Sequence, residues 1–210
     1  MKLLSESERK EIAAAIEQAE SKTSGEIVFT LADASSPYNH ATLQAGLIGL
    51  AAATAIYLAL PFAHTVAGVL WSEFISFAAF AALLSRHPWR RWFISKREMD
   101  ARVYEAAFMQ FYSSGLYKTR ESNGIEIYLS CFERRVVVIG DQGIHARMGN
   151  ARWDEIRDMI LHGIKQGKAC DGICAAIDRC GRTLGEHFPY RHDDINELPN
   201  AVIDRRLKSE

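Results

Sequence analysis

The sequence predicts a small layered α/β domain that is interrupted by a transmembrane helical hairpin. Strand-like and helix-like segments are mixed before and after the middle of the chain, and such a mixture packs as helices on a sheet. The middle itself holds two long apolar runs. We therefore expect residues 1–42 and 95–210 to form one discontinuous domain, and residues 43–94 to form the hairpin with its basic flank.

The segment before the apolar runs is expected to form a helix and then a strand. Ser5 and Glu8 have the spacing of a capping box. Ile12 and Ile16 lie one helical turn apart and mark the buried face of this helix. Residues 26–31 are rich in β-favouring side chains and predict the first strand.

The two apolar runs are long enough to cross a bilayer. Residues 46–63 carry no charge, and residues 66–84 contain Glu73 as their single ionisable residue. About 20 residues in a helix span a hydrocarbon layer of ~30 Å. Neither run has a polar stripe, so each needs lipid or a large core around it. Glu73 lies either near the outer interface beside Trp71, or inside the layer in a proton or ion path.

The residues that follow the second run predict its orientation. Five basic residues and two tryptophans mark this flank as cytoplasmic; they are Arg86, Arg90, Arg91, Lys96 and Arg97, with Trp89 and Trp92. Two spans return the chain to its starting side. We expect a multi-pass protein of the cell inner (cytoplasmic) membrane with both termini cytoplasmic, and with the lipid bilayer as its first partner.

After the hairpin, the spacing of apolar residues predicts a helix, two strands and two more helices. Their ranges are 96–114 for the helix, 125–130 and 135–139 for the strands, and 150–167 and 171–188 for the last helices. The run VVVIG at 136–140 is expected to be buried on both sides. The two strands need a third as partner, because an isolated hairpin is only marginally stable. The tail after Pro189 is expected to be irregular.

Composition argues against nucleic-acid binding. The chain has 25 basic and 26 acidic residues, a net charge of −1 and a pI near 6.7, whereas nucleic-acid binders carry a basic face. The four cysteines form no C-x-x-C pair and no zinc-like spacing with histidine. Three of them recur at roughly helical intervals, and we expect these to be small apolar groups in or near a helix core. The four cysteines are Cys131, Cys170, Cys174 and Cys180.

Several motifs together resemble the TPM domain family (TPM phosphatase-like domain). They are SGEIV at 24–28, NGIEIYLSCFERRVVVIGDQGI at 123–144, Trp153, and HFP…DINELPN near the C-terminus. The chain resembles the bacterial branch in which two membrane spans interrupt the domain. The resemblance implies a small α/β sandwich, membrane attachment and, from the family's label, a phosphatase-like activity. The segment GDQGIHARMGNARW is less glycine-rich and more basic than the family pattern.

Three carboxylates are candidate metal ligands. If the first two strands are parallel, Glu26, Glu126 and Asp141 share one end of the sheet, where they could hold calcium or magnesium with His145 assisting. Asp33 and Glu133 fall at the other end. Alternatively, Glu126 is the solvated half of an alternating strand, Glu26 pairs with a lysine, and Asp141 is a turn residue.

Two functions follow from these patterns. The first is a membrane-anchored interaction module that acts on membrane-protein complexes, because no nucleophile elbow, P-loop or Cys/Arg phosphatase signature is present. The second is a divalent-metal-dependent phosphatase-like hydrolase. A small transporter is disfavoured, because two spans with one carboxyl leave little to line a path. The tail residues Asp194, Asn196 and Glu197 form either a recognition surface or a cap on the domain edge.

Overall fold

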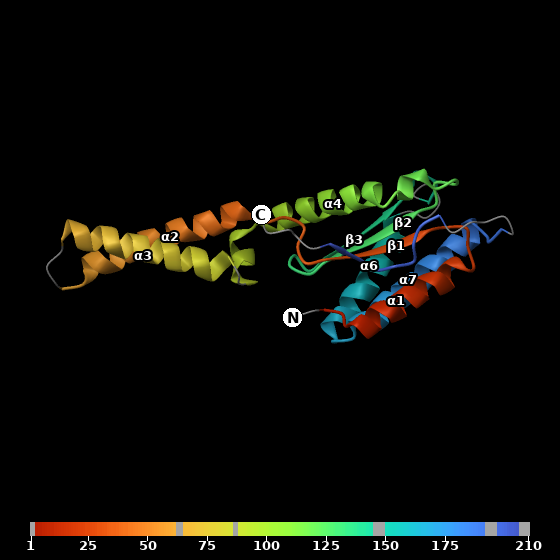
Figure 1. Cartoon of the computed structure of the whole chain (residues 1–210), viewed down its shortest axis with the longest axis horizontal. Coiled ribbons are helices and arrows are strands. Elements are labelled where there is room, and N and C mark those ends of the chain that lie inside the picture. The colour runs from red at the N-terminus through yellow and green to blue at the C-terminus, as the bar shows by residue number, and fades with distance from the viewer. Residues whose placement is uncertain (1–2, 62–64, 86–87, 145–149, 192–196, 206–210) are drawn as a thin grey trace. The chain divides into compact units, whose positions relative to one another are not determined.

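The chain divides into two compact units in a computed structural model that describes residues 3–61, 65–85, 88–144, 150–191 and 197–205. Unit 1 comprises Met1–Ser36 and Asp100–Glu210, and unit 2 comprises Pro37–Met99. Figure 1 shows the sheet in unit 1 and the two apolar helices in unit 2. Arg86 and the HFP…DINELPN residues 192–196 lie outside the described residues.

Unit 1 is built on a four-stranded sheet with the order β3-β2-β1-β4. The strands are β1 (Ile27–Ala32), β2 (Ile125–Ser130), β3 (Arg135–Gly140) and β4 (Ile203–Arg205). β2 is parallel to β1, with Ile27 opposite Ile125, and antiparallel to β3. The expected pairing between the strands on either side of the apolar runs is therefore confirmed.

Two expectations about the sheet are wrong. The tail is not irregular throughout, because Ile203 pairs in parallel with Thr30 and begins β4. The strand β3 is not buried on both sides, because it lies at the sheet edge and most of its residues are only half-buried. An edge strand has a neighbour on one side only, so its side chains are less completely covered.

Helices cover both faces of the sheet, and Figure 1 shows α1, α6 and α7 on one face and α4 on the other. Their bounds are α1 Glu6–Glu20, α4 Lys96–Ser113, α6 Asn150–Lys165 and α7 Ala169–His187, with short 3₁₀ helices η1 Pro88–Phe93 and η2 Leu116–Lys118. Phe29 and Ile127 belong to the large core under α1, α6 and α7. Tyr128 packs with Val103 of α4 in the core of the other face.

The helices α1 and α7 lie in close contact. A Cβ atom on Gly181 would lie only 2.7 Å from the Cβ of Ala19, so the absence of a side chain at Gly181 permits this approach. Further along, the Thr23 hydroxyl donates to the Phe188 carbonyl at 2.6 Å. The later residue Thr23 contacts the later residue Phe188, so α1 and α7 run in the same direction. The expected capping box begins α1, with Glu8 N–H donating to Ser5 Oγ at 3.3 Å and Ser5 N–H to Glu8 Oε2 at 2.7 Å.

Unit 2 consists mainly of α2 (Asn39–Ala59) and α3 (Val66–Ser85), which pack against each other. Among the described residues, α2 is the one helix that is both long and apolar enough to cross a membrane, and Val66–Ala82 of α3 is a shorter apolar segment. Large apolar side chains of both helices are exposed; they include Leu43, Leu47, Ile48, Ile56, Leu58, Val66, Leu70, Trp71, Phe74 and Ile75.

Glycines bring the two helices of unit 2 together. An added Cβ on Gly46 would lie 2.7 Å from the Phe77 ring, and one on Gly49 would lie 2.6 Å from the Phe80 ring. With Ala41 and Ala45, these glycines form the buried residues of α2. Such a row of small residues is typical of helices that pack inside membranes, where close backbone approach supplies the attraction.

Candidate functional site

The three carboxylates proposed from the sequence lie at one end of the sheet. Glu26 directly precedes β1, Glu126 is the second residue of β2, and Asp141 directly follows β3. The Glu26 carbonyl accepts from Ile125 N–H at 2.8 Å, and Asp141 N–H donates to the Gly124 carbonyl at 2.9 Å. The sheet register therefore places these backbone positions on adjacent strands.

The Glu26 side chain holds the C-terminal segment. Its Oε1 accepts from Glu197 N–H at 3.0 Å, and only 6% of the residue is exposed. This contact supports the interpretation of Glu197 as part of a cap on the domain edge. Asp194 and Asn196, the other members of that tail motif, lie outside the described residues.

Glu26 also lines a shallow acidic pocket with a volume of about 260 Å³. Two glutamates at the end of α1, Glu17 and Glu20, share this pocket with Tyr190. Glu20 Oε1 accepts from Ile27 N–H at 2.8 Å, so this carboxylate also fixes the start of β1.

Glu126 is a fully buried acid beneath α4, with 0% exposure. The alternative that it is the solvated half of an alternating strand is therefore wrong, because α4 covers that face. Burial raises the pKa of the Glu126 carboxyl to about 8, and its interaction with the Thr30 hydroxyl offsets only part of that effect. The group is consequently protonated and neutral at pH 7.

Asp141 serves in part as a turn residue. Its Oδ1 accepts from the next backbone N–H, that of Gln142, at 2.6 Å, which is the local bond that aspartate commonly makes in turns. His145, the proposed assisting residue, lies outside the described residues. Within the described ranges, Glu26, Glu126 and Asp141 do not form a compact ligand group. The calcium or magnesium site at these residues stays a prediction.

A second buried acid lies at the opposite end of the sheet. Glu133 follows β2 and has 0% exposure. Its Oε1 accepts from Ser35 N–H at 2.9 Å, and its Oε2 accepts from the Ser130 hydroxyl. Ser35 is in the last stretch of unit 1 before the chain enters unit 2. Glu133 therefore fixes the point at which the chain leaves the sheet.

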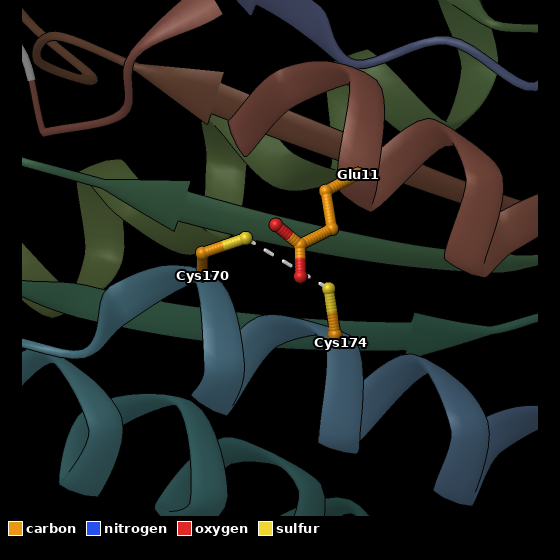
Figure 2. A group of neighbouring side chains, drawn as sticks. All are labelled: Glu11, Cys170 and Cys174. Atoms are coloured by element: carbon orange, nitrogen blue, oxygen red, sulfur yellow. Dashed lines mark hydrogen bonds between the residues drawn. The ribbon is translucent and has the colours of Figure 1, made fainter. Parts of the chain in front are cut away.

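A compact group of possible metal ligands lies elsewhere, on α1 and α7. The side-chain ligand atoms of Glu11, Cys170 and Cys174 all lie within 4.8 Å of one another. Figure 2 shows the three side chains pointing toward one another from the two helices. The sequence carried one signal for this group, the spacing of four residues between the two cysteines. The glutamate could not be assigned, because it comes from a helix that lies about 160 residues earlier in the chain.

The outer face of α4 and the following turn carry a row of exposed aromatic rings. Tyr104 stacks on Phe108 with ring centroids 6.5 Å apart, Phe108 lies 4.9 Å from Tyr112, and Tyr112 lies 5.1 Å from Tyr117. All four residues are more than 40% exposed. We call Tyr104, Phe108, Tyr112 and Tyr117 the aromatic row. Exposed, adjacent aromatic rings are typical of protein interaction surfaces.

Comparison with known proteins identifies the domain. Residues 81–183, which include β2, β3 and α6, match the family model described as the TPM domain. This segment is a TPM domain. A likeness in fold extends beyond the matched segment, because the chain is similar to the NMR structure of the BA42 protein from the psychrophilic bacterium Bizionia argentinensis. That likeness has a TM-score of 0.60 and 24% sequence identity, and it covers 97% of this chain and 96% of BA42. No curated protein matches the chain.

Proposed function

We propose that this chain is an inner-membrane protein in which α2 and α3 cross the bilayer as a hairpin and hold the TPM domain at the cytoplasmic surface. There the domain acts as an interaction module for membrane-protein complexes. The observation that carries the proposal is the pairing of β1 with β2. These two strands lie on either side of α2 and α3 in the sequence, so the chain between them must start and end on the same side of a membrane.

In this proposal α3 is the partner span of α2. If α2 crosses the bilayer, a second crossing is needed before β2, since one crossing alone would separate the paired strands. The helix α3 has 20 residues, which at about 1.5 Å per residue is roughly the ~30 Å of the hydrocarbon layer. The exposed apolar side chains of both helices would then face lipid.

The basic flank supports the orientation. Arg90 and Arg91 lie in η1, and Lys96 and Arg97 begin α4, whereas residues 60–65 between the two helices contain no acidic or basic residue except His64. Basic residues next to a span mark the cytoplasmic side. Cysteine accessibility in intact cells tests this arrangement. Cysteines introduced at position 61 should react with an impermeant reagent from outside, and those at position 7 should not; reaction at both positions would contradict it.

The aromatic row supports the interaction role. It is an exposed and largely uncharged strip beside the sheet, and a domain tethered by two spans meets membrane proteins at high local concentration. Photo-crosslinkers placed at Tyr104, Phe108 and Tyr112 should trap one and the same membrane protein. A crosslinker at Asp158 on α6 is the control. Crosslinks to lipid alone, or equal capture from Asp158, would contradict the role.

A second candidate is a divalent-metal-dependent phosphatase-like hydrolase. The acidic pocket beside Glu26 favours it, because calcium and magnesium prefer carboxylate oxygen ligands. The full chain in detergent should then hydrolyse a generic phosphate ester faster with added calcium or magnesium. Activity that Glu26→Gln combined with Asp141→Asn leaves unchanged would exclude these residues from such a site.

A further inference from the structure

The helices α1 and α7 bring two thiols and one carboxylate together. Cys170 and Cys174 are one turn apart on α7, and their Sγ atoms lie 3.9 Å apart. Glu11 extends from α1 toward both sulfur atoms, as Figure 2 shows. Cys170 is buried, Cys174 is half-buried and Glu11 is exposed, so the group opens to solvent on the side of the carboxylate.

The distance between the sulfur atoms fits one kind of occupant. In a tetrahedral zinc site each Zn–S bond is about 2.3 Å, which places two sulfur ligands roughly 3.8 Å apart. A disulfide requires a separation of about 2.05 Å, much less than the 3.9 Å in the structure. The two thiols are therefore placed to share a tetrahedral ion as they stand.

The ligand set also suits a soft divalent cation. Thiolates favour zinc-like ions over calcium or magnesium, and a carboxylate oxygen is an accepted third zinc ligand. Cys170 lies in the first turn of α7, where the helix dipole favours a negative charge. In the metal-free chain the Cys170 thiol donates to the Glu8 carbonyl at 3.7 Å, and the thiol gives up this bond when it loses its proton to a metal.

We propose that Glu11, Cys170 and Cys174 bind one tetrahedral cation of the zinc class, with a water molecule from the open side as fourth ligand. Binding breaks the two S–H bonds, releases both protons to solvent and forms two metal–sulfur bonds, with no change of oxidation state. The ion joins α1 to α7, so it links the element before the first strand to one that ends near the C-terminus.

Cobalt supplies a direct test, because Co²⁺ substitutes for Zn²⁺ and is coloured. The full chain, purified in detergent, reduced and freed of metal with a chelator, should bind one equivalent of Co²⁺. The sulfur-to-cobalt charge-transfer band and the strong visible bands of a tetrahedral site should appear together, and Zn²⁺ should abolish both.

Matched variants assign the ligands. The substitution Cys174→Ser should remove the charge-transfer band. The substitution Glu11→Gln should weaken zinc binding by at least about 10-fold, because a loss of that size is usual even for residues that only hold a metal ligand in place. Cys131→Ser is the control, since Cys131 is a half-buried thiol outside the group. The proposal is overturned if Cys131→Ser causes the same loss, or if cobalt binds to the wild-type chain without a sulfur band.

A second measurement needs no variant and so does not depend on how variants fold. Zn²⁺ should slow the alkylation of Cys174 in the reduced wild-type chain by at least about 10-fold, as followed by peptide mass spectrometry, because the metal-bound thiolate is blocked. Alkylation of Cys131 should keep its rate. Equal rates at Cys174 with and without Zn²⁺ would overturn the proposal.

Discussion

The Thr54 hydroxyl donates a hydrogen bond to Glu73 Oε1 at 2.9 Å, and this bond joins α2 to α3. The sequence alone left Glu73 either near an interface or in an ion path. The structure supplies a third role, in which the carboxyl is held by a hydroxyl of the neighbouring helix.

Replacing Thr54 with valine should weaken the hairpin. Valine keeps the shape of threonine but cannot donate, so Glu73 loses this partner. Hydrogen bonds between membrane helices are worth about 0.6–2 kcal/mol. A double-mutant cycle of Thr54→Val and Glu73→Gln, read from thermal unfolding of the full chain in detergent, should give a coupling of that size. A coupling of zero would show that the bond contributes nothing.

Enlarging a glycine of α2 should separate the two helices. Gly49→Leu places three further carbons beyond a Cβ that would already lie 2.6 Å from the Phe80 ring, and overpacking typically costs about 1–3 kcal/mol. Ala52→Leu is the control, because Ala52 is exposed on the same helix. Thermal unfolding in detergent should show a lower Tm for Gly49→Leu and little change for Ala52→Leu; the reverse order would contradict the packing.

Glu126 should make the stability of unit 1 depend on pH. Its pKa is about 8 in the folded chain and 4.5 in its ordinary state, so the folded state binds one more proton between these values. Its stabilising contribution is complete below about pH 4.5 and falls as pH rises, by about 1.4 kcal/mol per unit, until the folded pKa is reached.

The substitution Glu126→Gln should remove this dependence, because glutamine resembles the neutral acid at every pH. We expect Tm of the wild-type chain to fall from pH 5 to pH 8 relative to that of Glu126→Gln. The exposed acid Glu105, replaced by glutamine, is the control. Parallel Tm curves for wild type and Glu126→Gln would mean that burial does not hold the proton.

Removing the Glu133 carboxylate should destabilise unit 1. The substitution Glu133→Ala leaves Ser35 N–H and the Ser130 hydroxyl without this acceptor, and a buried polar group that loses its partner costs about 1–3 kcal/mol. Glu133→Gln retains an acceptor oxygen and should cost less. Denaturant unfolding of the two variants checks the order; an alanine variant as stable as glutamine would exclude the anchoring role.

Sequence reasoning succeeded where apolar periodicity is strong. The range of β2 was predicted without error and that of α4 to within one residue, because buried faces repeat along both elements. The capping box of Ser5 and Glu8 located the start of α1. It missed β4, whose three residues have no such pattern and become a strand only by pairing with β1. The burial of Glu126 was not predicted, because it depends on α4, which the alternation within one strand cannot reveal.

Contacts between elements also decided which candidate site could be predicted from the sequence. Strand order and polarity were enough to place Glu26, Glu126 and Asp141 at one end of the sheet. The group of Glu11, Cys170 and Cys174 requires knowledge of which helices are neighbours, and that depends on close contacts such as Gly181 against Ala19.

The partner of each residue in β1 is made late during synthesis. Ile27 pairs with Ile125, which is 98 positions further along the chain and is therefore synthesised much later. Until β2 and β4 have been made, β1 has neither of its neighbours in the sheet, and its six residues, all of them buried in the finished protein, are open to wrong partners. The interval between the synthesis of β1 and that of β2 is therefore a period in which the chain carries an unpaired, aggregation-prone strand.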